Sequence, residues 1–94
     1  MYAAVRRYEG IVDDDEAGRL VRESFMPELE KVAGFIAYYW IDAGEGVMAS
    51  TSVFQDREGA KASTDTAADW VRENIASLLP NPPIVVAGEV VASA

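Results

Sequence analysis

The centre of the chain, residues 35–54, reads FIAYYWIDAGEGVMASTSVF. Aromatic and β-branched residues dominate residues 35–42, small and acidic residues with two glycines fill 43–46, and β-formers return in 47–54. Two strand-forming runs joined by a short glycine-containing connection are typical of a β-hairpin. The stretch therefore predicts an antiparallel hairpin at the centre of the fold.

On the N-terminal side, residues 2–9 favour a first strand, because β-formers alternate there with small residues. A helix is expected to follow over residues 13–34. Asp13 and Glu16 have the spacing of a capping box, apolar residues then recur at helical spacing, and Gly34 supplies a left-handed stop.

Pro27 interrupts this first helical pattern. Proline has no N–H to donate and its ring crowds the preceding turn, so we expect a kink or a break. A regular helix would place Glu28 within the apolar stripe, whereas a kink at Pro27 would rotate it outward. We expect Glu28 to face solvent.

On the C-terminal side, Asp56 is expected to cap a second helix that reaches about Leu79. Polar residues around Asp65 offer a second cap, at which the helix could restart. The prolines within residues 80–83 cannot continue a helix and predict an extended connection to a last strand at residues 84–92.

The resulting order, βαββαβ, predicts an α+β fold of the ferredoxin-like, split βαβ kind, in which an antiparallel sheet carries both helices on one face. A chain of 94 residues has room for one core, so residues 1–94 form a single domain. The other sheet face should then be polar. Instead, the strands 35–42 and 84–92 are apolar at alternate positions on both faces.

A bare apolar face of this kind requires a cover. We expect a homodimer formed through the open sheet face, as in a dimeric α+β barrel. The alternative is a twisted sheet with a partly exposed aromatic face.

Charge excludes one class of partner. The chain has 8 basic and 16 acidic residues, a net charge of -8, and such a surface repels nucleic acid. No apolar run approaches the ~20 residues of a membrane span, and the first residues contain no apolar signal segment. We therefore expect no membrane partner and a cytoplasmic location.

The chain contains no cysteine and no histidine. This excludes thiol nucleophiles, Ser-His-Asp triads and imidazole ligands for haem or zinc. The carboxylates of residues 13–16 splay around a helix start, and we interpret them as a capped, solvated terminus. We expect no metal site and no cofactor.

Candidate site residues lie on the second helix and on the strands. Trp70, Asn74 and Ser63 flank the inward stripe of the helix, where an indole, an amide and a hydroxyl can orient an aromatic or quinone-like ligand. Packing at the helix-sheet seam explains the same tryptophan.

The strands add Arg6, Tyr8, Tyr38 and Ser50. Arg6 and the tyrosines can donate protons or stabilise a phenolate, but each also suits an interface or a core. Ser50 belongs to a polar strand centre, which indicates a wet cavity or hydroxyl pairs across the sheet.

Short motifs along nearly the whole chain carry a family resemblance. They comprise Pro27, Val32, Ala33, Gly34, Phe35, Tyr38, Val53, Phe54, Asp56, Ala60, Ala67, Trp70, Gly88, Glu89 and Val90. In this order they resemble the antibiotic biosynthesis monooxygenase-like family of dimeric α+β barrels. The resemblance implies a homodimer with a cavity between helices and sheet. Some members oxygenate polyphenolic substrates without metal or flavin; others degrade haem, isomerise lactones or have no known reaction.

The resemblance places Trp70 where oxygenating and haem-degrading members have a tryptophan, with Asn74 one turn later. Those members also use an asparagine on the first strand or a histidine on a helix. Here the first strand offers Arg6 and Arg7, and histidine is absent. Haem ligation is therefore not expected, and oxygenation would rest on Trp70, Asn74, Arg6 and a tyrosine.

The sequence supports two functional hypotheses. The first is a cofactor-independent monooxygenase, or related small-molecule enzyme, for an aromatic or polyphenolic substrate. Arg6 or Asn74 would stabilise the oxyanion and Trp70 would form a wall, with substrate bound by Tyr8, Tyr38, Ser63 and Ser50. The second is a non-catalytic dimeric ligand-binding or stress-associated module. The first hypothesis predicts a closed cavity, whereas the second predicts a filled helix-sheet space.

Overall fold

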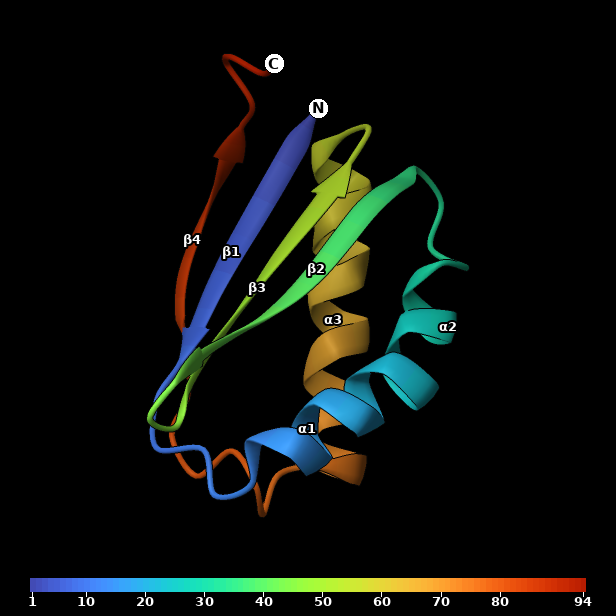
Figure 1. The fold of residues 1–94 in the computed structure, drawn as a ribbon. Helices are drawn as coiled ribbons and strands as arrows, with labels where there is room; N and C mark the ends of the chain where they lie inside the picture. Colours follow the sequence, from blue (N-terminus) through green and yellow to red (C-terminus); the bar gives the residue numbers. More distant parts are fainter.

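The computed structural model describes residues 1–94 as one antiparallel sheet with its helices on one side (Figure 1). The sheet has four strands in the order β2-β3-β1-β4. The elements are β1 (Tyr2–Tyr8), α1 (Asp14–Leu20), the π-helix η1 (Val21–Phe25), α2 (Met26–Leu29), β2 (Phe35–Gly44), β3 (Val47–Phe54), α3 (Arg57–Asn74) and β4 (Ile84–Glu89). This confirms the α+β, ferredoxin-like fold.

The predicted central hairpin is formed by β2 and β3. Its turn is tight because Gly44, Glu45 and Gly46 all have positive φ, a conformation that glycine adopts without steric penalty. The Asp42 side chain supports the turn, since its Oδ1 accepts a hydrogen bond from the Gly44 N–H at 2.9 Å. As a result, β2 continues beyond the predicted end at Asp42.

A register shift between Phe35 and Ala37 decides which β2 side chains face the helices. Strict alternation would place Phe35 and Tyr38 on opposite faces of the sheet. The shift brings both, together with Trp40, against the buried core, whereas Tyr39 is exposed on the open side. Aromatic rings are thereby concentrated beneath the helices.

Pro27 breaks the first helix, as predicted. Because Pro27 has no N–H for the carbonyl of Glu23, the chain widens into the π-helix η1 before the short α2. The helical segment ends at Leu29, earlier than the predicted stop at Gly34. Glu28 is exposed, in agreement with the expected outward rotation.

The second helix, α3, begins as predicted and ends early. The Asp56 side chain accepts a hydrogen bond from the Gly59 N–H at 2.9 Å. The helix does not restart near Asp65, because neighbouring threonine hydroxyls donate to carbonyls one turn back and fit inside the helix. It ends at Asn74, and the residues up to Leu79 form turns. No helix combines the length and apolar character of a membrane span.

The last strand is also shorter than predicted. β4 pairs only with β1, and the first residue of that strand, Tyr2, is paired with Glu89. Pairing therefore stops at Glu89 rather than at Ala92, because no partner strand continues beyond it. In Figure 1, β4 lies at the sheet edge opposite β2.

The face of the sheet away from the helices is apolar and bare. Its exposed large residues include Val5, Ile41 and Ile84, with Tyr39 60% and Val86 69% exposed. The structure of one protomer thus agrees with the expected apolar open face. The helix side carries the buried core instead, which includes Val21, Phe25, Leu29, Met48, Phe54, Trp70 and Ile75.

Candidate functional site

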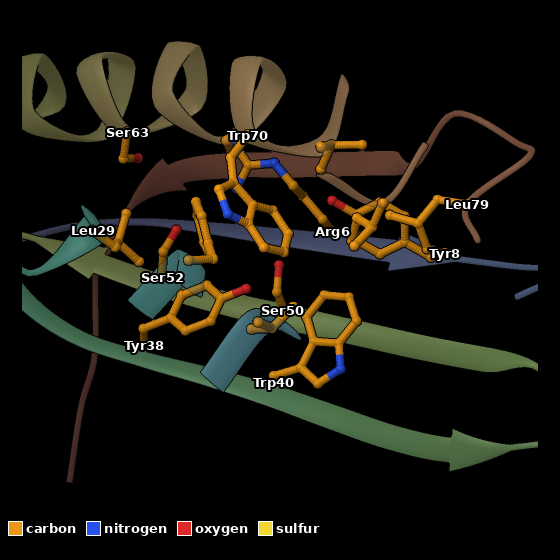
Figure 2. Close-up of a pocket in the computed structure, with 15 residues that line it drawn as sticks. Arg6, Tyr8, Leu29, Tyr38, Trp40, Ser50, Ser52, Ser63, Trp70 and Leu79 are labelled. Carbon is orange, nitrogen blue, oxygen red and sulfur yellow. The ribbon is translucent and has the colours of Figure 1, made fainter. Parts of the chain in front are cut away.

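A pocket lies between α3, the η1–α2 segment and the sheet (Figure 2). Its free volume is about 20 Å³, which has room for about one water molecule. The lining includes Arg6, Tyr8, Phe25, Tyr38, Trp40, Ser50, Ser52, Ser63 and Trp70. Figure 2 shows Trp70 reaching from α3 toward the strands. The pocket therefore combines aromatic walls with hydroxyls and one cation.

Arg6 is the only charged residue that lines this pocket. It points inward because β1 alternates, with Ala4, Arg6 and Tyr8 buried on the helix side. The residue is 7% exposed. Its Nη2 donates a hydrogen bond to the Thr64 Oγ1 on α3 at 2.7 Å.

The charge of Arg6 has no negative partner. Arg6 takes part in none of the five ion pairs of the structure, and no aspartate or glutamate lines the pocket. A buried cation without a counter-charge carries a desolvation penalty that a bound anion would offset. The pocket is therefore electrostatically suited to an anionic group.

The two pocket tyrosines are neutral hydrogen-bond donors at physiological pH. Burial raises the pKa of Tyr8, and the nearby Arg6 charge lowers it by a smaller amount. Burial also raises the pKa of Tyr38, an effect that the Ser50 hydroxyl partly opposes. Both phenols keep their protons and can donate them in hydrogen bonds to a ligand oxygen.

Aromatic contacts hold the walls of the pocket in place. The Phe25 ring lies between Tyr38 and Trp70, with ring centroids 5.5 Å and 5.2 Å away. Tyr8 packs against Trp40 at 5.5 Å. The Trp70 indole is also fixed by its Nε1, which donates to the Ser24 Oγ at 2.8 Å. Flat walls of this kind favour a planar ligand.

The structure brings together all the predicted site residues except Asn74. The side chains of Trp70, Arg6, Tyr8, Tyr38, Ser63 and Ser50 line the pocket. Asn74 is exposed, and its Nδ2 donates to the backbone carbonyl of Trp70 at 2.9 Å. One helical turn beyond Trp70, near the end of α3, the Asn74 side chain lines a separate outer groove instead.

Sequence reasoning missed several residues that shape the pocket. Trp40 and Ser52 could have been found, because they lie two positions from Tyr38 and Ser50 on the same strand faces. Thr64 and Ser24 could not, since their hydrogen bonds to Arg6 and Trp70 span 58 and 46 positions of sequence.

The hydrogen-bonding groups that line the pocket are mainly donors. They are one guanidinium, two phenols, three serine hydroxyls and two indole N–H groups, of which the Trp40 Nε1 is buried without a partner. No carboxylate lines the pocket to act as a general base. No three carboxylates in the structure are arranged so that they could hold a metal ion. The arrangement can hold a negatively charged oxygen against an aromatic wall.

Comparison with known proteins gives a fold but no family membership. No family model matches the chain, and no curated protein matches it significantly. A protein of unknown function from Nitrosomonas europaea has a TM-score of 0.79 and 24% identity, with 99% of this chain and 91% of that chain covered.

Two further solved structures have described activities. A monooxygenase from Streptomyces coelicolor, solved in complex with nanaomycin D, has a TM-score of 0.71 and 19% identity over 98% of this chain and 92% of that chain. An antibiotic biosynthesis monooxygenase has a TM-score of 0.74 and 17% identity, with 98% of this chain and 100% of that chain covered. The chain therefore has the fold of antibiotic biosynthesis monooxygenase-like proteins, as the motifs predicted.

The unpaired Arg6 charge predicts a gain in stability when it is removed. Arg6→Met should raise the free energy of unfolding of the ligand-free protein by about 1 to 3 kcal/mol, because methionine fills similar space without charge. Thr64 loses the hydrogen bond that it accepts from Arg6, but its hydroxyl still donates to Ala60 O. Urea denaturation measures the change. The control Arg72→Met, on the exposed face of α3, should shift it by less than about 0.5 kcal/mol. A destabilised Arg6→Met would contradict this prediction.

The buried tyrosines predict a loss of stability at alkaline pH. In the unfolded chain both phenols titrate at the ordinary tyrosine pKa of 10.0, whereas in the folded protein their pKa values are higher. The stabilisation is thus fully present below that pH and decreases as the pH rises toward the folded values. Tyr38→Phe should reduce this alkaline decrease in denaturation experiments. The exposed control Tyr39→Phe should leave the alkaline decrease in stability unchanged. If the free energy of unfolding falls equally steeply with pH in both variants, the contribution of Tyr38 is refuted.

Proposed function

We propose that the chain, which shares its fold with antibiotic biosynthesis monooxygenases, is a cofactor-independent monooxygenase or a related small-molecule enzyme. Its substrate is an aromatic or polyphenolic molecule with an ionisable hydroxyl group. The observation that carries the proposal is the buried, unpaired Arg6 charge in an aromatic pocket. A substrate oxyanion supplies the missing negative charge. The nanaomycin D complex of the Streptomyces coelicolor monooxygenase supports a small-molecule ligand for this fold.

Each pocket group has a role in this proposal. Arg6 binds the substrate oxyanion, and the neutral phenols of Tyr8 and Tyr38 donate further hydrogen bonds to substrate oxygens. Trp70 forms the wall against which the substrate ring lies. The hydroxyls of Ser50 and Ser63 complete the polar lining. Asn74 has no role, because its amide is outside the pocket and bonded to the helix backbone.

The substrate anion itself supplies the electrons for the reaction. Anthrone gives a C–H proton to water, and Arg6 stabilises the oxygen of the resulting enolate. The carbanion carbon of this anion then forms a C–O bond to dioxygen, which is reduced to the peroxide level. Protonation by water gives a hydroperoxide, and loss of water leaves a carbonyl. One CH₂ group and one O₂ become one C=O and one H₂O, with dioxygen as the oxidant. The protein contributes stabilisation of the anion and orientation of the ring.

The size of the pocket favours a second candidate function. A free volume of about 20 Å³ means that the helix-sheet space is nearly filled in this conformation. A non-catalytic dimeric ligand-binding or stress-associated module would have such packing. The unpaired Arg6 nevertheless favours the enzyme, because a purely structural core gains nothing from a buried cation.

We infer a homodimer for either function, formed in the cytoplasm through the open sheet face. The exposed apolar side chains of β1, β2 and β4 support this, because two copies related by a two-fold axis would remove them from water. The helices lie on the other side of the sheet, so the pocket of each protomer stays within that protomer.

The dimer predicts a mass of twice 10.2 kDa in sedimentation at low micromolar concentration. Val86→Glu, on the open face of β4, should raise the dimer dissociation constant by about tenfold or more, because it places a charge in the interface. The control Val91→Glu lies beyond β4 and should have no effect. A wild-type monomer at that concentration would exclude the open-face dimer.

The enzyme predicts oxygen consumption with anthrone or a quinol. Arg6→Met should lower kcat by about 10² to 10³, the loss expected when one oxyanion donor is removed. Arg72→Met is the matched control and should retain full activity, because Arg72 is exposed on α3. Oxygen uptake by the wild type that does not exceed that of Trp70→Phe would count against the enzyme.

Native mass spectrometry of freshly purified protein distinguishes the two candidates. A retained aromatic ligand is expected for an occupied Arg6 pocket and contradicts a filled core.

A further inference from the structure

A groove on the outer surface lies behind the Trp70 ring. It has a volume of about 400 Å³ and is lined by side chains from η1, α2 and α3. Trp70 is the one residue that lines both this groove and the inner pocket. The indole thus separates a space for about one water molecule from a mostly polar groove whose volume is enough for a small aromatic molecule to pass.

A single side-chain hydrogen bond holds the indole between the two spaces. The Trp70 Nε1 on α3 donates to the Ser24 Oγ on η1 at 2.8 Å. The η1 segment is π-helical because Pro27 removes a donor, and π-helical turns inside α-helices are frequent at functional sites. Its Val21 and Phe25 side chains are buried in the core, whereas Ser24 is only half-buried. The wall of the pocket therefore depends on a bond to the least regular part of the helical layer.

The rim of the groove is acidic. Glu28, Asp69 and Glu73 line it. Glu28 has a distant partner, Lys31 at 3.9 Å, and Asp69 pairs with Arg72, but neither cation lines the groove and Glu73 has no ion pair. With a net charge of -8 on the chain as well, the rim repels anions and admits neutral molecules and cations.

We propose that the Ser24–Trp70 hydrogen bond closes the ligand entrance of the pocket, and that the acidic rim admits the neutral form of an ionisable aromatic ligand. The inference rests on the proposed function, because the ligand is the substrate of the Arg6 pocket. A neutral phenol crosses the rim and ionises only beside Arg6, and its proton passes to water. The rim and the interior thus select different protonation states of one molecule.

Fluorescence quenching tests the closure without any ligand. The chain has two tryptophans, so Trp70 is the single tryptophan of a Trp40→Phe variant. Ser24→Ala should raise the acrylamide quenching constant about fivefold, the effect of losing one ordinary hydrogen bond. The control Ser77→Ala, in the exposed turn after α3, should leave it unchanged. An unchanged constant in Ser24→Ala overturns the closure.

Charged quenchers test the rim. In the Ser24→Ala, Trp40→Phe protein, caesium should quench Trp70 more strongly than iodide does when each constant is divided by the constant for free N-acetyltryptophanamide. Replacing the rim carboxylates (Glu28→Gln, Asp69→Asn, Glu73→Gln) should bring the two constants together. The matched control (Asp13→Asn, Asp14→Asn, Asp15→Asn) removes the same charge far from the groove and keeps the helix cap. If both triple variants change the caesium and iodide constants by the same amount, the rim carboxylates do not select by charge.

Stopped-flow binding of alizarin, a coloured hydroxyanthraquinone, tests the entrance with a ligand. Ser24→Ala should raise its association and dissociation rates by similar factors, about fivefold, and leave Kd nearly unchanged. Arg6→Met should instead raise Kd and abolish the absorbance shift of the bound anion. If alizarin does not bind the wild type, the proposed function fails. If it binds with equal rates to wild type and Ser24→Ala, the entrance fails and the proposed function stands.

Discussion

The buried Arg6 charge is the constraint around which the helix side of the sheet is organised. Because β1 is a central strand, the pleat alternates its side chains between the two faces, and Arg6 cannot leave the interior without moving its buried neighbours. The surroundings accommodate the charge with the Thr64 hydroxyl and the serines of β3, but they offer no carboxylate. In the proposed function, the substrate oxyanion supplies the negative charge that the protein does not.

Both faces of the sheet depart from the ordinary pattern of an apolar covered face and a polar bare face, although the covered face still carries the apolar core. The covered face contains Arg6, Ser50 and Ser52, whereas the bare face displays Tyr39, Val86 and other large apolar residues. Burying polar groups and exposing apolar ones both work against the stability of an isolated protomer. Each departure agrees with the proposed function, which assigns a ligand site to the covered face and a self-association surface to the bare face.

Pro27 connects local sequence with the proposed site in a similar way. Its missing N–H produces η1, and η1 carries Phe25 into the pocket and Ser24 to the Trp70 indole. A regular helix would have been more stable locally. Its irregularity instead places a π-helical turn, which Val21 and Phe25 anchor in the core, next to the pocket for which a ligand is proposed.

The sequence by itself determined the central hairpin, the cap at Asp56 and the apolar open face, because turn chemistry, capping and alternation act between residues a few positions apart. It also indicated that Trp70 and Arg6 face a common space. Only the tertiary structure decided that Asn74 lies outside that space, that Thr64 and Ser24 hold Arg6 and Trp70, and that Arg6 lacks a counter-ion. These facts depend on the exact ends of helices and on contacts between distant segments, which packing of the whole chain sets and local patterns do not encode.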